Sequence, residues 1–466
     1  MTFLLAACAV LCGLLGACGE KKEKESYIWY YPGETFVDSK AVNDAANEIF
    51  EKKLGVSVKM SPITPRYYDN KMKLLISSGE DYDICFTSNW TNNFQNNVLS
   101  GVFYPITELL EKTPALGETI PDFVWEGTKY NSQVYAVPNY QVLYAQKSLV
   151  VTSEVAEKYG SYLENIENLE DLEPFFDKVY SENDVKKGLS NDLGHDFWLN
   201  NEQIVGAEMF SVKVGDDKVF CSYLVPEYED YINTMSRFLK KGYVGQDMYS
   251  NVQTGGELIS ATLYKPGALK YDENGNPISV KYIVLGEPTI SQKAGVSALT
   301  AISKDCKDPL TALKVIELVN KDKELYNTMC FGIEGVHYKK ETENVITLTG
   351  TQRYNLNRDW VFGNQFNAYY TDVENVGSWE ETEKINREAA RGKLYNFRFD
   401  IDKVKAEITM LESIISEYKY LEEGVDEIGN DYNEFKEKLI DAGALRVQEE
   451  IQRQIDEFEE NETKGM

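Results

Sequence analysis

The sequence predicts an α/β protein with more than one hydrophobic core and a helical C-terminal region. Strand-like and helix-like segments alternate between residues 27 and 86, and apolar residues recur at helical spacing near the end of the 466-residue chain. Alternation of this kind is typical of a parallel sheet covered by helices. A chain of this length exceeds what one core normally supports, so two lobes are expected.

The alternation begins with an aromatic, β-prone run at residues 27–31 that ends before a Pro-Gly pair. Apolar residues at helical spacing follow in segments 42–54 and 68–76, and a glycine stands directly after the first helix and shortly after the second. Segments 56–60 and 82–86 read as strands. The order is therefore strand, helix, strand, helix, strand.

Further elements follow along the chain. A strand at residues 134–138 comes after the turn-prone pair Asn131-Ser132, which predicts a hairpin. The remaining segments are predicted helices at 169–179, 228–239 and 309–321, a strand at 281–285, and C-terminal helical stripes at 404–418 and 447–458. Neither stripe persists for several heptads, so both are interpreted as packing surfaces and not as a coiled coil.

The first 17 residues are uncharged and almost wholly apolar. The run is too short for a membrane-spanning helix and has the character of a secretion signal. It ends at Leu15-Gly16-Ala17-Cys18, which resembles a bacterial lipobox, so Cys18 is the predicted site of lipid attachment. Residues 18–26 are predicted to be a disordered, charged tether.

Composition narrows the possible partners. Hydrophobic residues make up 42% of the chain, as in globular proteins, and the formal net charge is −28. Nucleic-acid phosphates and an anionic membrane surface would both repel such a chain. Contact with the membrane is expected through the lipid anchor only, at the extracellular face of the cell membrane.

Cysteine and histidine usage argues against a metal centre. Outside the signal and the lipidation site, the four cysteines are widely spaced, at Cys85, Cys221, Cys306 and Cys330. A disulfide between Cys306 and Cys330 is one alternative, but free, buried thiols are favoured. Only two histidines are present, which makes a zinc site or a His-based triad hard to assemble. No metal or cofactor is expected.

Several motifs in order resemble those of the extracellular solute-binding proteins of ABC importers, in the LplA-like lipoprotein branch that ends in an extra helical module. Besides the lipobox, the landmarks are the segments 81–84, 135–138, 332–338, 360–365 and 449–454. The resemblance implies a two-lobed periplasmic-binding-protein-like fold, α/β in class, with an interlobe ligand cleft and C-terminal helices. It also implies a carbohydrate ligand and ABC permease partners. A monomer is expected, and the two lone histidines and the absence of catalytic motifs predict no enzymatic activity.

The resemblance also implies how the chain divides between the lobes. Residues 27–139 plus 296–331 form the first lobe, and residues 140–295 plus 332–466 form the second lobe with the helical module. The chain is expected to cross near residues 138–145, to return near 286–295 and to cross a third time near 332–338.

Candidate ligand-binding residues in the first lobe follow its strands. Ligands bind beyond the carboxyl ends of strands in open parallel sheets, which singles out Ser88, Asn89 and Trp90 after the third strand and Tyr31 after the first. A tryptophan there can stack on a sugar ring, while Ser and Asn can bind hydroxyl groups. The alternative is that Trp90 packs against the next helix.

Other candidates lie at the crossings and in polar loops. Tyr140 and Gln141 follow Pro138 at the first crossing, where they contact either ligand or the hinge. Trp198 lies in a glycine-punctuated polar loop, either facing ligand or anchoring that loop. The region near the third crossing adds Glu334, Tyr338, Trp360, Asn364 and Gln365.

Trp90 and Trp360 are predicted to come from opposite lobes and to face one cleft. The other tryptophans outside the loops, Trp29, Trp125 and Trp379, are interpreted as packing residues. Two alternative functions stay open. A glycoside hydrolase would need two facing carboxylates, which 76 acidic residues allow but no motif presents. A peptide-binding or sensory lipoprotein could use the same fold.

Overall fold

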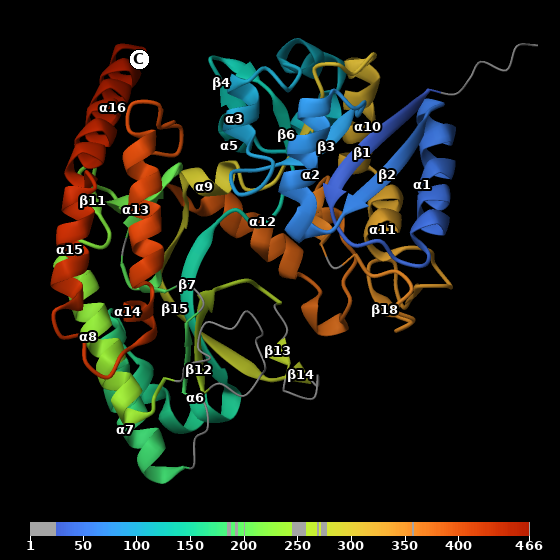
Figure 1. Cartoon of the computed structure of the whole chain (residues 1–466). Coiled ribbons are helices and arrows are strands. Elements are labelled where there is room, and N and C mark those ends of the chain that lie inside the picture. The colour runs from blue at the N-terminus through green and yellow to red at the C-terminus, as the bar shows by residue number, and fades with distance from the viewer. Residues whose placement is uncertain are drawn as a thin grey trace, which may run out of the picture.

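The computed structural model describes residues 25–183, 188–191, 194–199, 201–244, 258–267, 270–271, 277–356 and 358–465. Two five-stranded sheets, each with its own core, are the centres of two lobes (Figure 1). The predicted signal, the lipidation site Cys18 and most of the predicted tether lie outside the described residues.

The first lobe has a five-stranded sheet of order β2-β1-β3-β16-β6. Its strands are β1 (Ser26–Pro32), β2 (Ser57–Ile63), β3 (Ile84–Thr87), β6 (Ala136–Pro138) and β16 (Leu299–Ile302). Strand β1 pairs in parallel with β2 and β3, whereas β16 runs antiparallel to β3 and β6. This arrangement confirms the predicted parallel start of the chain.

Helices cover both faces of this sheet. They are α1 (Ser39–Leu54), α2 (Pro65–Ser78), α3 (Phe94–Leu99), α4 (Pro114–Thr119), α5 (Asp122–Trp125), α9 (Gln292–Gly295), α10 (Pro309–Lys321) and α11 (Lys323–Phe331). Helices α1 and α2 end where Gly55 and Gly79 adopt φ values of 74° and 68°, a conformation that glycine reaches without steric cost. The predicted hairpin turn forms between β4 (Lys129–Tyr130) and β5 (Gln133–Val134).

The second lobe is built on a sheet of order β19-β15-β7-β12-β8. Its strands are β7 (Ala145–Thr152), β8 (Leu189–Asn191), β12 (Ile259–Leu263), β15 (Val280–Ile290) and β19 (Ala390–Arg391). A second, antiparallel sheet contains β9 (Asn201–Ile204), β10 (Ala207–Lys213) and β11 (Val219–Cys221); β13 (Lys270–Tyr271) and β14 (Pro277–Ile278) form a small ribbon. The helices are α6 (Ser153–Tyr159), α7 (Glu173–Glu182) and α8 (Pro226–Lys241).

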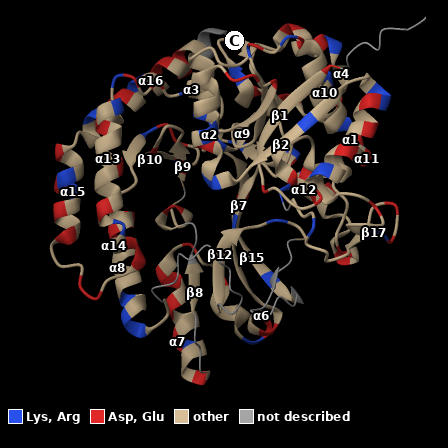
Figure 2. Cartoon of the chain, turned by 45° about the vertical axis from the view of Figure 1, so that its right-hand side comes forward, with Lys and Arg blue, Asp and Glu red and all other residues tan. Residues whose placement is uncertain are grey.

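The C-terminal helices form a module on the outside of the second lobe (Figure 1). They are α13 (Lys405–Tyr418), α14 (Tyr420–Glu423), α15 (Asp431–Asp441) and α16 (Ala444–Gly465). Their apolar stripes, which include Leu411, Leu439 and Ile451, are buried in the core of that lobe. Acidic side chains are distributed over helices of both lobes, with many on the module (Figure 2).

One boundary prediction is wrong. The chain does not cross to the second lobe near residues 332–338: it forms a hairpin of β17 (Tyr338–Lys340) and β18 (Ile346–Leu348). Val361, Phe362 and Ala389 are then buried in the first core, and the third crossing occurs at β19, which pairs with β15. The segment between the hairpin and β19, including α12 (Ser378–Glu388), therefore belongs to the first lobe.

The four described cysteines are buried and unpaired. The alternative of a disulfide between Cys306 and Cys330 is therefore not realised. Trp29 and Trp125 are buried in the first core, as predicted, and Trp379 packs against it.

Candidate functional site

An aromatic cluster of Phe86, Trp90 and Trp360 lies at the carboxyl edge of the first-lobe sheet. The Trp90 and Trp360 ring centroids are 5.9 Å apart, and each ring lies 5.8 Å from that of Phe86. Trp90 keeps 51% of its surface exposed, whereas Trp360 is half-buried. The indole of Trp90 donates a 2.8 Å hydrogen bond to the carbonyl of Ser297, which fixes the ring. An indole held this way offers an apolar face to a flat ligand.

The structure brings Trp90 and Trp360 together but does not place them on opposite lobes. Both lie on the first lobe, because Val361 and Phe362 anchor the segment of Trp360 in the first core. The Phe362 ring packs edge-on against the rings of Trp29 and Tyr31, at 6.1 and 5.6 Å. The prediction of opposite lobes is thus corrected, while the proximity of the two rings is a finding of the structure.

The residues before Trp90 shape its loop. The hydroxyl of the buried Ser88 accepts hydrogen bonds from the main-chain N–H groups of Thr91 and Trp90, at 3.0 and 3.3 Å. Ser88 therefore supports the loop. Asn89 is half-buried, and its Oδ1 has no hydrogen-bond donor among the described residues. Tyr31 is only 5% exposed and belongs to the first core, and burial raises the pKa of its hydroxyl.

The residues at the first crossing brace the aromatic cluster from behind. Tyr140 is fully buried against Phe366, and its carbonyl accepts a 2.8 Å hydrogen bond from the N–H of Gln365. The Gln365 side chain donates to Asp359, the residue before Trp360, at 2.9 Å. These contacts couple the crossing segment to the turn that carries Trp360.

Two neighbours of these residues have similar supporting contacts. The Asn364 side chain accepts a 3.0 Å hydrogen bond from the N–H of Phe366 and so caps the following turn. The carbonyl of Gln141 accepts a 2.7 Å hydrogen bond from Asn386 on α12. Each of these hydrogen bonds fixes a main-chain segment, and neither places a polar side chain on the surface for a ligand to contact.

Glu334 and Tyr338 lie in the hairpin of β17 and β18. Glu334 is exposed and forms an ion pair with Lys340 at 3.1 Å. Tyr338 is buried in a small cluster with Ile346 and Tyr369 that is separate from both cores. The structure does not bring these two residues to the aromatic cluster, because the expected third crossing is absent here.

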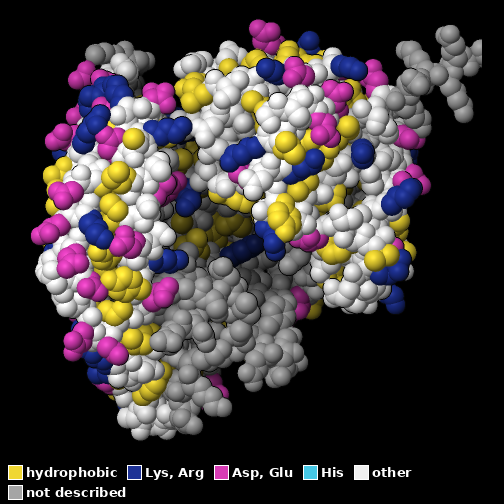
Figure 3. Space-filling model, viewed as in Figure 1, with side chains coloured by type: hydrophobic (Ala, Val, Ile, Leu, Met, Phe, Trp, Pro, Cys, Tyr) yellow, Lys and Arg dark blue, Asp and Glu magenta, His cyan; other side chains and the backbone are white. Residues whose placement is uncertain are grey.

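The second lobe contributes a pocket of about 520 Å³ next to the crossings. Its lining includes Lys147 on β7 and the paired residue Leu285 on β15, both within a few residues of the segments that cross between the lobes. Trp198 lines it as well, packed at 5.0 Å on Phe197, and its buried indole nitrogen has no acceptor in the described part of the chain. Figure 3 shows the molecule hollowed between the lobes.

Charged groups surround this pocket. Lys147 donates to the carbonyls of Leu199 and Asp196, and burial lowers the pKa of its amine to about 8. His195, Lys213, Glu227, Asp230 and Thr234 also line the cavity. The sequence analysis did not select Lys147. Its place in β7, directly after the expected first crossing, is the one signal that could have identified it. The pocket's other polar groups come from the segment 167–170, the loop 194–199, β10 and α8, and they meet only in the folded lobe.

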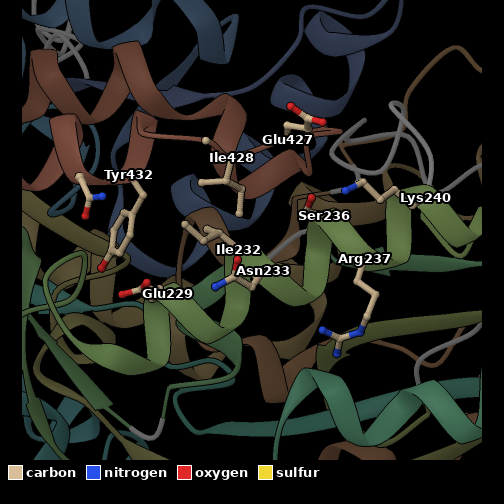
Figure 4. A pocket seen from close by; sticks show the side chains of 11 residues that line it. Glu229, Ile232, Asn233, Ser236, Arg237, Lys240, Glu427, Ile428 and Tyr432 are labelled. Carbon is tan, nitrogen blue, oxygen red and sulfur yellow. The ribbon is translucent and has the colours of Figure 1, made fainter.

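A further hollow lies between α8 and the C-terminal module (Figure 4). Its volume is about 450 Å³, and its lining includes Glu229, Arg237, Lys240 and Tyr432. All of its residues come from α8 and the module, and it shares no lining residue with the Trp198 pocket. Within the described ranges, no helix is both long and apolar enough to cross a membrane, and no cluster of His, Cys, Asp and Glu has the arrangement of a metal site.

Comparisons with known families and proteins agree on one class. Residues 45–331 match the family model for bacterial extracellular solute-binding proteins, and residues 393–460 match a domain of unknown function, DUF3502. A carbohydrate ABC transporter substrate-binding protein of Streptococcus pneumoniae is 25% identical over 476 residues, which cover 98% of this chain and 96% of that protein.

Solved structures with the same fold also include carbohydrate-binding proteins. The N-glycan transport solute binding protein NgtS of S. pneumoniae gives a TM-score of 0.80 at 22% identity, over 94% of this chain and 100% of that one. Its complex with Man5GlcNAc gives 0.70 at 23% identity, over 94% and 99%. An HMO binding protein of Bifidobacterium longum infantis gives 0.63 at 12% identity, over 93% and 99%.

Proposed function

Because this chain belongs to the family of bacterial extracellular solute-binding proteins, we propose that it captures an oligosaccharide between its lobes and delivers it to an ABC permease. The observation that carries the proposal is Trp90, a half-exposed indole held at the edge of the first lobe. The Trp198 pocket of the second lobe supplies a second aromatic side chain beside hydrogen-bonding groups. The carbohydrate class of the S. pneumoniae relative supports the choice of ligand.

Sugar recognition suits this combination of groups. An indole face packs on the apolar C–H face of a pyranose, while carboxylates, amines and hydroxyls bind the ring hydroxyls. Pockets that fix a small ligand usually combine apolar walls with a few such polar groups. The Trp198 pocket has a volume of about 520 Å³, which lies within the range of pockets that bind small ligands.

A thermal-shift screen of mono- and oligosaccharides, including Man5GlcNAc, tests the ligand class. A ligand that binds only the folded state at 100 times its Kd stabilises it by about 2.7 kcal/mol, so true ligands raise the melting temperature. A panel in which only peptides shift the melting temperature would replace the carbohydrate proposal with the peptide-binding alternative.

We also propose that the protein acts without catalysis, as a monomer. The family model that the chain matches describes solute-binding proteins, which supports this proposal. An oligosaccharide incubated with equimolar protein and analysed by mass spectrometry should be recovered intact. Stoichiometric or faster cleavage of any glycan would favour the hydrolase alternative instead.

The proposed membrane anchor is a lipid on Cys18. The apolar run, the small residues before Cys18 and the charged residues after it support this assignment. Cys18→Ser should release the protein into the medium or leave its signal uncleaved, as fractionation and intact mass would show. Unchanged membrane retention at unchanged mass contradicts the assignment.

A further inference from the structure

His195 is a buried polar residue that ligand capture alone does not explain. It is only 3% exposed and lies in the loop 194–199, which also carries Trp198. Its Nδ1 lies 3.2 Å from a carboxylate oxygen of Glu422, and its Nε2 lies 3.6 Å from a carboxylate oxygen of Asp196. The imidazole is thus placed between two acidic groups.

The first of these carboxylates comes from the C-terminal module. Glu422 lies on α14 and is 8% exposed. Gly194 adopts a φ of 61°, and a Cβ placed there would lie 3.2 Å from the other Glu422 oxygen. The start of the loop therefore packs directly against this side chain.

The second carboxylate ties the loop to the antiparallel sheet. Asp196 accepts a 2.7 Å hydrogen bond from the Gln203 side chain and a 3.4 Å hydrogen bond from that of Asn201. Lys147 donates to the carbonyls of Asp196 and Leu199. The loop is consequently held at three sides, of which the module provides one.

The module itself is attached to the second lobe close to this point. The Ser236 hydroxyl on α8 donates to the carbonyl of Val425, just after α14. The Tyr432 hydroxyl on α15 donates to the carbonyl of Tyr223 at 3.2 Å, and the Tyr223 ring lies 4.8 Å from that of His195. Figure 4 shows Tyr432 and Ile428 of the module facing Ile232 and Ser236 of α8.

We propose that Glu422 acts through His195 as a positioning residue for Trp198, so that the C-terminal module forms part of the support of the ligand site. The predicted effect on ligand binding rests on the proposed function. The anchoring of the loop by Glu422 does not depend on it, because it is a property of the ligand-free protein. Removal of one partner from a buried ion pair leaves the other charge uncompensated, so the loop loses its fixed geometry.

The strength of the contact between His195 and Glu422 depends on pH, because the imidazole is charged only when it is protonated. Burial lowers the pKa of His195, but the hydrogen bond and charge of Glu422 and the charge of Asp196 outweigh it and raise the pKa overall. The other titratable groups that face the ring are Tyr223 and, on α8, Tyr228 and Tyr231. Because the pKa is raised, the stabilisation is complete below about pH 6.5 and is lost as the pH rises through the folded-state pKa.

Hydrogen exchange of the full-length protein without ligand tests the anchor. In Glu422→Gln, amides of the loop 194–199 should exchange at least tenfold faster than in wild type. Glu417→Gln, which breaks an exposed ion pair with Lys438 in the same module, is the matched control and should leave the loop unchanged. Unaltered loop exchange in Glu422→Gln overturns the proposal. If that variant does not fold, His195→Gln decides: its loop protection, corrected for intrinsic rates, should fall less between pH 6 and 9 than that of wild type, in which Lys147 also titrates. An identical fall in both proteins overturns the proposal.

Binding of Man5GlcNAc tests the consequence for the ligand. Glu422→Gln should bind at least tenfold more weakly than wild type and should lose the part of the pH profile that His195 contributes. His195→Gln should give the same flattened profile, which separates this group from Lys147 and Asp196. Binding by Glu422→Gln equal to wild type across the pH range overturns the positioning role. Failure of wild type to bind any sugar would instead count against the proposed function, and the exchange experiment would still decide the anchor.

Discussion

Individual aromatic residues have different roles according to their exposure. Trp90 is 51% exposed and rests on Phe86 and Trp360, whereas Trp360 is half-buried and packs against the first core. Truncation of Trp90 should therefore remove ligand contacts with little loss of stability. Truncation of Trp360 should also remove packing.

Trp360→Ala is accordingly expected to lower both binding and stability. Loss of a half-buried indole should reduce the free energy of unfolding by on the order of 2 kcal/mol, and the tilted ring of Trp90 loses its neighbour. Trp360→Phe should restore most of the stability. Thermal unfolding and sugar titration of both variants measure the losses of stability and of binding. Tyr67→Ala, at an exposed aromatic of the same lobe, is the control. A Trp360→Ala variant with unchanged melting temperature would contradict the packing role.

A second residue-scale effect concerns Glu202 on β9. It is 7% exposed, its Oε1 has no donor in the described ranges, and its carboxylate lies against Gly392. Burial raises the pKa of this carboxyl to about 7. Since the folded-state pKa is raised above 4.5, the associated stabilisation is present below pH 4.5 and is lost as the pH rises through 7.

Glu202→Gln should therefore stabilise the protein at pH 8 and give no gain at pH 5. The expected difference in the free energy of unfolding at pH 8 is about 1–3 kcal/mol. Thermal melts at both pH values test this, and Glu157→Gln, an exposed change on α6, is the control. A uniform effect at both pH values would mean that the ionisation of Glu202 is not involved.

At the scale of elements, local sequence signals predicted much of the first lobe. Helices α1 and α10 follow from apolar spacing, and a glycine marks the end of α1. Local sequence signals could not assign residues 332–389 to a lobe, because an apolar pattern shows that a segment is buried but does not show which core buries it. For the same reason the sequence selected Trp90 and Trp198 but not Phe86 or Lys147, whose positions depend on tertiary packing.

The N-cap of α10 gives a test at this scale. Asp308 accepts a 3.0 Å hydrogen bond from the N–H of Thr311 and a 2.7 Å hydrogen bond from its hydroxyl. Asp308→Ala should cost about 1 kcal/mol of stability, because an N-terminal N–H group loses its partner. Chemical denaturation measures this. The exposed Asp305→Ala is the control, and an equal effect of both substitutions would show that the cap contributes nothing.

The whole molecule consists of two cores joined by crossing segments, with a hollow between the lobes (Figure 3). The proposed ligand contacts Trp90 and Trp198 belong to different lobes. A ligand shifts such lobes toward closure only if it binds the closed state more tightly, which requires contacts from both sides.

Calorimetric titration of one oligosaccharide into wild type, Trp90→Ala and Trp198→Ala tests the central claim most directly. The two side chains belong to different lobes, so capture between the lobes predicts that each truncation weakens binding by more than about tenfold, or 1.4 kcal/mol. Circular dichroism should show both variants folded. If every oligosaccharide in the panel fails to bind wild type, or if either variant binds as tightly as wild type, the proposed capture of a carbohydrate between these two tryptophans is contradicted.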